Sequence, residues 1–457
     1  MSANMRLAFV VLLGCLTVGS IHSLITGPGH GKVVVCYIGT WAVYRPGRGS
    51  FTLEHIDPNM CTHLVYSFAG LNTTHDSIRS LDPWQDLTED YGKGGYERIV
   101  RLKDRYPHLK VTIAIGGWNE GSENYSKLAA DPMRRSRFVQ SAVQFLKKYN
   151  FDGLDLDWEF PGKRGGTPAD KQNFLLLVKE LRSAFNPFNF LLTAAFGAGK
   201  DTIDVAYDVA GLSVYLDYIH MMCYDYHGTW DQKTGANAPL FSTDVYSVEY
   251  SIEYMLQMGA PATKLVMGIP LYGRTFILPE SVESEAPAFK KPQRLGEIAK
   301  SVGFQGPLTR ENGFMGYNEI CVEMRNKTAR WSQHWDEKTR TPFLALENKV
   351  IAYDDPRSIR EKIKFAISKR LAGAMVWSID TDDFQGDCVE QGLDFKNFPL
   401  MRSINKAIIA ELEEDRRNKE NEILHGDGNS KISSANVIQK NIWVLLVFVV
   451  HLFVVRY

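Results

Sequence analysis

The stretch FDGLDLDWEFPG, residues 151–162, alternates acidic and apolar side chains. Successive side chains of a β-strand point to opposite faces, so we expect Asp155, Asp157 and Glu159 to share one face. The other face carries the apolar residues between and before them, Leu154, Leu156 and Trp158. Crowded carboxylates destabilise a strand because like charges repel, which indicates that these acids serve a function.

Three buried acids in a row cannot all be ionised at low cost, because each negative charge raises the pKa of its neighbours. A glutamate in such a row stays protonated near neutral pH and can act as a general acid. A calcium-binding loop is the alternative for spaced acids, but it needs a glycine at the turn and polar residues between the acids. The leucines and the tryptophan of this stretch therefore favour a catalytic site.

Apolar runs of strand length recur along the chain, and helical patterns lie between them. The eight runs are residues 32–38, 62–70, 110–117, 151–159, 188–196, 216–225, 264–273 and 372–380. The helical patterns include residues 134–148, 171–185 and 358–369. Eight such units predict an α/β fold, a parallel (β/α)8 or TIM barrel. An open doubly wound sheet is the alternative, but no glycine-rich phosphate loop follows the first run. Glu159 would lie nearest the C-terminal mouth of the barrel, where barrel enzymes hold their active sites.

The interval between the seventh and eighth runs is much longer than the others. We expect residues 277–351 to form an inserted subdomain, because loops of that length are rarely structureless. After residue 405 the chain becomes highly charged, in AELEEDRRNKENE. Residues 406–441 are therefore predicted as a final helix that grades into an exposed stalk.

Both ends of the chain carry short apolar runs. Residues 1–23 have a positive start, an apolar stretch and small residues, which predicts a secretory signal peptide; a membrane anchor is the alternative, but the run is too short. The run IWVLLVFVVHLFVV lies in residues 442–457, and small residues stand upstream at 426–430. That order resembles a glycosylphosphatidylinositol (GPI) anchor signal, with a short membrane helix as the alternative. The prediction is a secreted protein tethered to the cell surface.

Composition narrows the choice of partners and compartment. The formal net charge is -1 and 44% of residues are hydrophobic, so a sizeable core is expected, and the lack of a net positive charge argues against nucleic acid as a partner. Three sequons predict glycosylation at Asn72, Asn124 and Asn326. Removal of the signal peptide leaves five cysteines, which implies two disulfides and one thiol in an oxidising compartment. A bridge between Cys36 and Cys61 is feasible, because they lie on the first two barrel units.

Four motifs resemble those of glycoside hydrolase family 18, the chitinases and their relatives. The run DGLDLDWE resembles the family signature D-G-x-D-x-D-x-E. The motifs AIGGW (residues 114–118), MCYDYHG (222–228) and GAMVWSIDTDDF (373–384) resemble those of its third, sixth and eighth strands. The resemblance covers residues 32–405 and points to animal enzymes, those of arthropods in particular. It implies a family 18 catalytic barrel whose insertion is an α+β subdomain forming one wall of a deep groove.

The resemblance implies an endo-acting, retaining chitinase that hydrolyses β-1,4 bonds between N-acetylglucosamine units of chitin or chito-oligosaccharides. In that family the substrate's own N-acetyl carbonyl attacks the anomeric carbon, an exception to the two-carboxylate scheme. Glu159 would be the general acid and base, and Asp157 would orient the N-acetyl group. Asp155 would share a proton with Asp157, and Tyr224 would donate to the acetamide oxygen. The resemblance implies a monomer that uses no metal and no cofactor.

The same resemblance implies a set of sugar-binding residues: Tyr37, Trp118, Met222, Asp225, Trp230, Tyr272, Arg274 and Trp377. Trp377 would form the floor under the sugar at the bond to be cut. Trp118 and Trp230, and less so Trp41, would be stacking platforms, with local packing as the alternative for each. Arg274 could instead hold the insertion in place.

The family's bridge from the insertion to the end of the barrel would join Cys321 to Cys388. Cys223 would remain unpaired, and its place between Met222 and Tyr224 points its side chain away from the site, which favours inert packing over a catalytic thiol.

Two other functions are compatible with the same motifs. A chitinase-like lectin binds sugar without cutting, but such relatives usually lose the terminal glutamate or a neighbouring acid. Here Glu159, Asp157, Asp155 and Tyr224 are all present. A hydrolase of another N-acetylglucosamine-containing glycan, such as an N-glycan core, would keep the fold and the mechanism.

Overall fold

The computed structural model describes residues 27–279, 294–388 and 397–425. The predicted signal peptide (residues 1–23), the second part of the predicted stalk (426–441) and the apolar tail (442–457) lie outside these ranges. Within the ranges, no helix combines the length and the apolar character that crossing a membrane requires.

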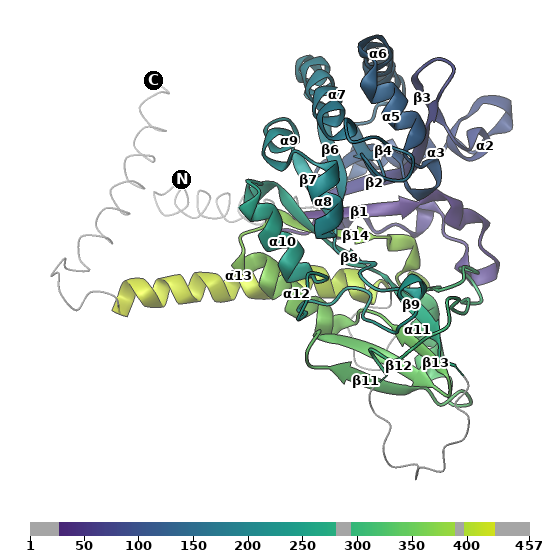
Figure 1. Ribbon diagram of the computed structural model, residues 1–457, viewed down its shortest axis with the longest axis vertical. Helices are drawn as coiled ribbons and strands as arrows, with labels where there is room; N and C mark the ends of the chain where they lie inside the picture. The colour runs from purple at the N-terminus through teal and green to yellow at the C-terminus, as the bar shows by residue number, and fades with distance from the viewer. Residues whose placement is uncertain (1–26, 280–293, 389–396, 426–457) are drawn as a thin grey trace, which may run out of the picture. The chain divides into compact units, whose positions relative to one another are not determined.

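Eight parallel strands form a closed barrel (Figure 1). They are β1 (Val33–Gly39), β2 (His63–Asn72), β4 (Lys110–Gly116), β5 (Gly153–Asp157), β6 (Leu191–Gly197), β7 (Tyr218–Met222), β8 (Leu265–Pro270) and β14 (Gly373–Trp377). β1 pairs with β14 on one side and with β2 on the other, which closes the sheet. A short strand, β3 (Ser77–Ser80), pairs antiparallel with the end of β2. The predicted TIM barrel is confirmed, because each of the eight strands pairs with two others of the eight, whereas an open sheet would leave two edge strands with one neighbour each.

Most helices lie between these strands along the chain, and the last helix follows β14. They are α2 (Pro83–Asp86), α3 (Gly95–Val100), α4 (Leu102–Arg105), α5 (Glu123–Ala130), α6 (Pro132–Tyr149), α7 (Asp170–Phe185), α8 (Lys200–Ala206), α9 (Val209–Tyr215), α10 (Val248–Gln257), α11 (Tyr317–Arg325), α12 (Pro356–Ser368) and α13 (Pro399–His425). Helix α6 shows how local sequence sets the bounds. The Asp131 side chain accepts from the backbone N of Met133, Pro132 occupies the first position, and Asn150 ends the helix in the left-handed region.

The segment between β8 and β14 forms a second, five-stranded antiparallel sheet. Its strands are β9 (Tyr272–Ile277), β10 (Phe314–Gly316), β11 (Ser332–Asp336), β12 (Thr341–Leu346) and β13 (Lys349–Ala352), in the order β10-β9-β13-β12-β11. Together with α11 they make the inserted α+β subdomain. The sheet begins at Tyr272 rather than at residue 277, because the apolar run 264–273 continues from a barrel strand into a strand of the insertion with only Leu271 between them.

Two disulfides tie the chain together. Cys36 on β1 is joined to Cys61, just before β2, and Cys321 on α11 is joined to Cys388 after β14. The second bridge links the insertion to the end of the barrel. Both predicted pairings are present, and Cys223 is unpaired and buried. Burial raises the pKa of the Cys223 thiol to about 12, which suits inert packing rather than nucleophilic chemistry.

Helix α13 continues through the predicted end of the barrel at residue 405 without a break. Its first turn is capped by Asp382, whose carboxylate accepts from the backbone N of Leu400 and of Met401. Residues 411–421 of this helix are partly or fully exposed.

Candidate active site

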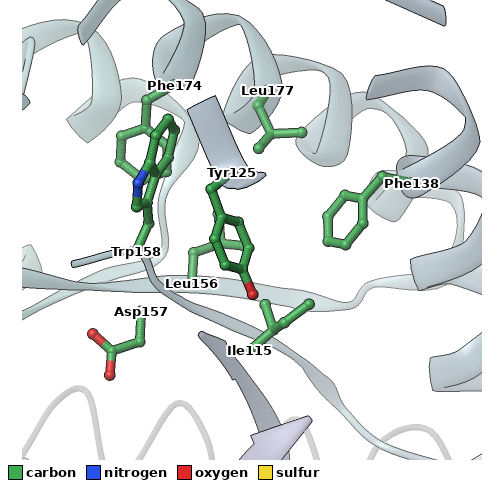
Figure 2. Close-up of a pocket in the computed structure, with 8 residues that line it drawn as sticks. All are labelled: Ile115, Tyr125, Phe138, Leu156, Asp157, Trp158, Phe174 and Leu177. Carbon is green, nitrogen blue, oxygen red and sulfur yellow. The ribbon is translucent and has the colours of Figure 1, made fainter. Parts of the chain in front are cut away.

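The acids of residues 151–162 lie on and just after β5. Asp155 and Asp157 are buried, and Figure 2 shows the Asp157 carboxyl group on one side of the strand with Leu156 and Trp158 on the other. The apolar side chains lie against α5, α6 and α7, among Tyr125, Phe138, Phe174 and Leu177. The alternation therefore places the acids inside the barrel. β5 ends at Asp157, so Glu159 stands beyond the strand, in the segment that follows its C-terminal end.

Three side chains from other strands of the barrel hold Asp155. The Tyr37 hydroxyl donates to Oδ2 at 2.6 Å, and Thr193 Oγ1 donates to Oδ1 at 2.5 Å. His220 Nδ1 lies 3.1 Å from Oδ1 and 2.8 Å from the Tyr37 hydroxyl. Strand register explains part of this set, because Asp155 on β5 is paired with Thr193 on β6. Asp155 is thus held from β1, β6 and β7 at once.

Asp157 differs from Asp155 in its surroundings. Burial raises the pKa of Asp157 well above its ordinary value, and the charges of Glu159 and Asp155 raise it further. Its Oδ1 atom is buried and has no hydrogen-bond partner in the part of the chain that the structure describes. Within that part no hydrogen bond joins Asp157 to Asp155, so the shared proton implied by the family resemblance has no direct contact here. Oδ1 is available to a donor from a ligand.

Glu159 has an electrostatic environment suited to proton transfer. Burial raises the pKa of its carboxyl group to about 7, the Arg164 guanidinium lowers it, and the charge of Asp225 raises it. A carboxyl group with a pKa near 7 can both donate and accept a proton close to neutral pH. The expectation that crowding and burial keep one acid protonated agrees with this environment.

The residues after β7 connect the barrel to the insertion. Asp225 has a positive φ of 57°, and its Oδ1 accepts from the Tyr272 hydroxyl and from Arg274 Nε, both at 2.7 Å. Tyr224 and Met222 pack on the core cluster inside the barrel that also includes Tyr37, and Trp377 packs there too. The structure therefore brings these predicted residues together around the acids. Arg274 pairs with Asp225 and belongs to β9 of the insertion, so it links the two parts of the chain, and its role in sugar binding stays a prediction.

The predicted aromatic residues differ in exposure: Trp377 is half-buried, and Trp41, Trp118 and Trp230 are exposed. Trp377 lies edge-on to Tyr37, with ring centroids 5.7 Å apart, and Trp41 is stacked on Phe68 at 6.1 Å. Trp118, Trp230 and Trp41 are 60%, 55% and 46% exposed. Indole rings this exposed are not explained by core packing alone.

Three residues that contact Asp155 or Trp118 were not predicted from the sequence. Thr193 and His220, which hold Asp155, are the polar residues inside the otherwise apolar runs LLTAAF and YIHMM, and that contrast was a usable signal. Arg164 places its guanidinium 3.5 Å from the Trp118 ring centroid. It lies in a loop of ordinary composition, and no sequence pattern singled it out.

The predicted glycosylation sites differ in exposure. Asn124 and Asn326 are exposed, and Asn72 is partly buried. The Asn72 side chain accepts from the backbone N of Thr74 and of His75. Glycosylation at the three sites stays a prediction.

Comparisons with known proteins agree with this geometry. The family described as glycosyl hydrolases family 18 matches residues 33–382. A Drosophila melanogaster protein named probable chitinase 2 is 49% identical over 473 residues, covering 96% of each chain. The structure of an Ostrinia furnacalis Group IV chitinase in complex with allosamidin is 39% identical, covers 83% of this chain and 99% of that chain, and has a TM-score of 0.76. Human YKL-39, described as a pseudo-chitinase with retained chitooligosaccharide binding, is 32% identical, covers 82% of this chain and 99% of that chain, and has a TM-score of 0.71.

Proposed function

Because the chain belongs to glycosyl hydrolase family 18, we propose that it is a chitinase of the endo-acting, retaining type. Its substrate would be chitin or chito-oligosaccharides, cut at the β-1,4 bonds between N-acetylglucosamine units. The observation that carries the proposal is Glu159, whose carboxyl group has a pKa raised to about 7 by burial. It stands two residues from the buried Asp157, whose Oδ1 has no hydrogen-bond partner among the described residues. The names of the insect relatives support the same substrate.

In the first step protonated Glu159 gives its proton to the glycosidic oxygen, and the bond from that oxygen to the anomeric carbon breaks. The carbonyl oxygen of the substrate's own N-acetyl group forms a new bond to the anomeric carbon, which gives an oxazolinium ion. Asp157 Oδ1 accepts from the acetamide N–H, and this hydrogen bond orients the acetamide and stabilises the positive intermediate. The Tyr224 hydroxyl donates to the acetamide oxygen.

In the second step the Glu159 carboxylate takes a proton from a water molecule, and the water oxygen attacks the anomeric carbon. The bond to the acetamide oxygen breaks, so the N-acetyl group is restored. Two displacements at one carbon retain its configuration. Glu159 ends protonated, ready for the next cycle.

A binding protein without catalysis is the second candidate, because the structural relative YKL-39 is described as a pseudo-chitinase. Glu159 distinguishes the two functions, since a binder does not need a carboxyl group that titrates near neutral pH.

We further propose secretion through residues 1–23 and a surface tether through residues 442–457. Release from cells by a phosphatidylinositol-specific phospholipase would support a GPI anchor, and persistent attachment would support a membrane helix.

The deciding experiment is cleavage of chitotetraose and chitohexaose by the wild type and by Glu159→Gln. We expect the variant to lose about a thousandfold in kcat while it still binds the oligosaccharides. Glu253→Gln, at a surface ion pair with Lys369, is the matched control and should cleave normally. Thiazoline analogues of the oxazolinium ion should inhibit the wild type. Equal activity of wild type and Glu159→Gln, or an inactive wild type, would refute the proposed function.

A further inference from the structure

Arg164 lies in the loop between β5 and α7 and contacts two residues of the proposed active site. Its guanidinium carbon is 3.5 Å from the centroid of the Trp118 ring. Its Nη1 donates to the backbone oxygen of Glu159 at 3.1 Å. One side chain therefore bridges an exposed aromatic ring and the residue that would carry the catalytic proton.

The loop that carries Arg164 is held at several points. The buried Asp170 accepts from the backbone N of Gly162 at 3.1 Å and of Thr167 at 2.8 Å. Ser122, four residues after Trp118 in the segment that follows β4, donates from Oγ to the backbone oxygen of Phe160 at 2.8 Å. The segment after β5 is therefore fastened both to itself and to the segment after β4.

Two glycines let these segments approach closely. Gly165 has a φ of +91°, which side-chain-bearing residues rarely adopt. A Cβ atom on Gly166 would lie 2.4 Å from Asp170 Oδ2 and 2.9 Å from Ser122 Oγ, so a side chain there would push the segments apart. Arg164 itself has a φ of 50°. The backbone thus directs this arginine across the contact and onto Trp118.

The charge of Arg164 also acts on Glu159. The groups that face Glu159 are Asp157 on its own segment, Asp225 after β7, the hydroxyls of Tyr207 and Tyr224, and Arg164. Burial and Asp225 raise the pKa of Glu159, whereas Arg164 lowers it. Loss of the arginine charge would therefore favour the protonated form of Glu159 at a higher pH.

We propose that Arg164 is a positioning residue that fastens Trp118 to the backbone of Glu159, so that a sugar stacked on Trp118 is held in register with the acid. The inference rests on the proposed function. Trp118 remains 60% exposed although the guanidinium packs on it, so much of the ring is open to a sugar. A ring that is already held loses less freedom when the sugar binds, which strengthens binding.

The test compares Arg164→Ala, Arg164→Lys and Trp118→Ala with wild type on chitotetraose and chitohexaose. Arg164→Ala should raise KM about two- to fivefold, the size expected for loss of an exposed cation–π contact, and should move the basic limb of the kcat/KM profile to higher pH. Arg164→Lys keeps the charge but lacks the planar guanidinium, so it should raise KM and leave the basic limb in place. In the double variant, Arg164→Ala should raise KM little beyond the value of Trp118→Ala, because the contact between the two side chains is already lost in Trp118→Ala.

Arg330→Ala is the matched control, an exposed arginine with a φ of 50° in the insertion, and it should behave as wild type. Thermal unfolding of each variant checks that the fold is intact. If the wild type is active, two results would overturn the inference and leave the proposed function standing. One is that the KM of Arg164→Ala equals that of the wild type; the other is that the effects of Arg164→Ala and Trp118→Ala on KM are fully additive. An inactive wild type refutes the proposed function itself. In that case calorimetric binding of chitohexaose decides the inference: weaker binding by Arg164→Ala supports the contact with Trp118, and equal binding overturns it.

Discussion

The Tyr37 hydroxyl donates a 2.6 Å hydrogen bond to Oδ2 of Asp155, and both side chains are buried inside the barrel. Asp155 in turn raises the pKa of Asp157 through its charge. Tyr37 on β1 is thereby linked, through Asp155, to Asp157, the acid that would accept a hydrogen bond from the acetamide N–H. Glu159, the outermost of the three acids, therefore lies above a network of buried polar contacts that reaches across the barrel.

Tyr37→Phe should lower kcat about ten- to hundredfold, because Asp155 would lose a buried donor to a charged group. The free energy of unfolding should fall by about 1–3 kcal/mol. Steady-state kinetics and urea unfolding measure the two effects. Tyr66→Phe is the matched control, since Tyr66 donates an equally short bond to Asp86 elsewhere. It should lose similar stability and keep full activity. A Tyr37→Phe enzyme as active as Tyr66→Phe would show that the Asp155 contact is only structural.

The pH dependence of kcat/KM should have a basic limb near pH 7. Glu159 must be protonated to act as the acid, and burial raises its pKa to about 7, so activity falls as pH rises through that value. Asp225→Asn removes a charge that raises this pKa, so the basic limb should move to lower pH. Asp415→Asn, on the exposed part of α13, should leave the profile unchanged. A basic limb that stays in place in Asp225→Asn would contradict this electrostatic assignment.

Glu159→Gln should stabilise the protein increasingly as pH rises. The pKa of Glu159 in the folded state is raised from 4.5 to about 7, so the unfolded chain releases this proton first. Below about pH 4.5 Glu159 is protonated in both the folded and the unfolded state, so it does not change the free energy of unfolding. As the pH rises from about 4.5 to about 7, Glu159 lowers the free energy of unfolding of the wild type by a growing amount. Glutamine does not titrate, so the variant should gain about 1–3 kcal/mol over wild type at pH 8 and little at pH 4. Urea unfolding at the two pH values tests this, and an equal difference at both would argue against the raised pKa.

The faces of β5 could be predicted from sequence because strand alternation is a local property. The hydrogen-bond partners of Asp155, in the same stretch, could not be predicted in this way. Its donors Tyr37 and Thr193 and the adjacent His220 come from three other strands, and which residues meet inside a barrel depends on the register of those strands. Sequence patterns carry no such register.

The motif GAMVWSIDTDDF shows that acidic clusters are ambiguous in sequence. Asp380 accepts from the backbone N of Gly39 and from Arg45, both from the first barrel unit. Asp382 caps α13. These buried acids fasten chain segments, whereas those of β5 face the centre of the barrel. Composition is similar in the two places, and only the partners separate a structural carboxylate from one proposed to be catalytic.

The last prediction concerns the buried ion pair of Lys362 on α12 with Asp354, which lies outside the proposed active site. Both side chains are fully buried, and Ser358 Oγ donates to the same oxygen of Asp354 at 2.6 Å. Lys362→Met should lower the free energy of unfolding by about 3–5 kcal/mol, because it leaves a buried carboxylate without its cation.

Asp354→Asn added to Lys362→Met should recover part of that loss, since the remaining charge is removed as well. Urea unfolding of both single variants and the double variant gives the coupling energy. The half-exposed pair of Lys369 and Glu253 is the control, and its loss should cost under about 1 kcal/mol. Strictly additive losses at Lys362 and Asp354 would mean that the two charges do not support one another and that packing alone accounts for the cost.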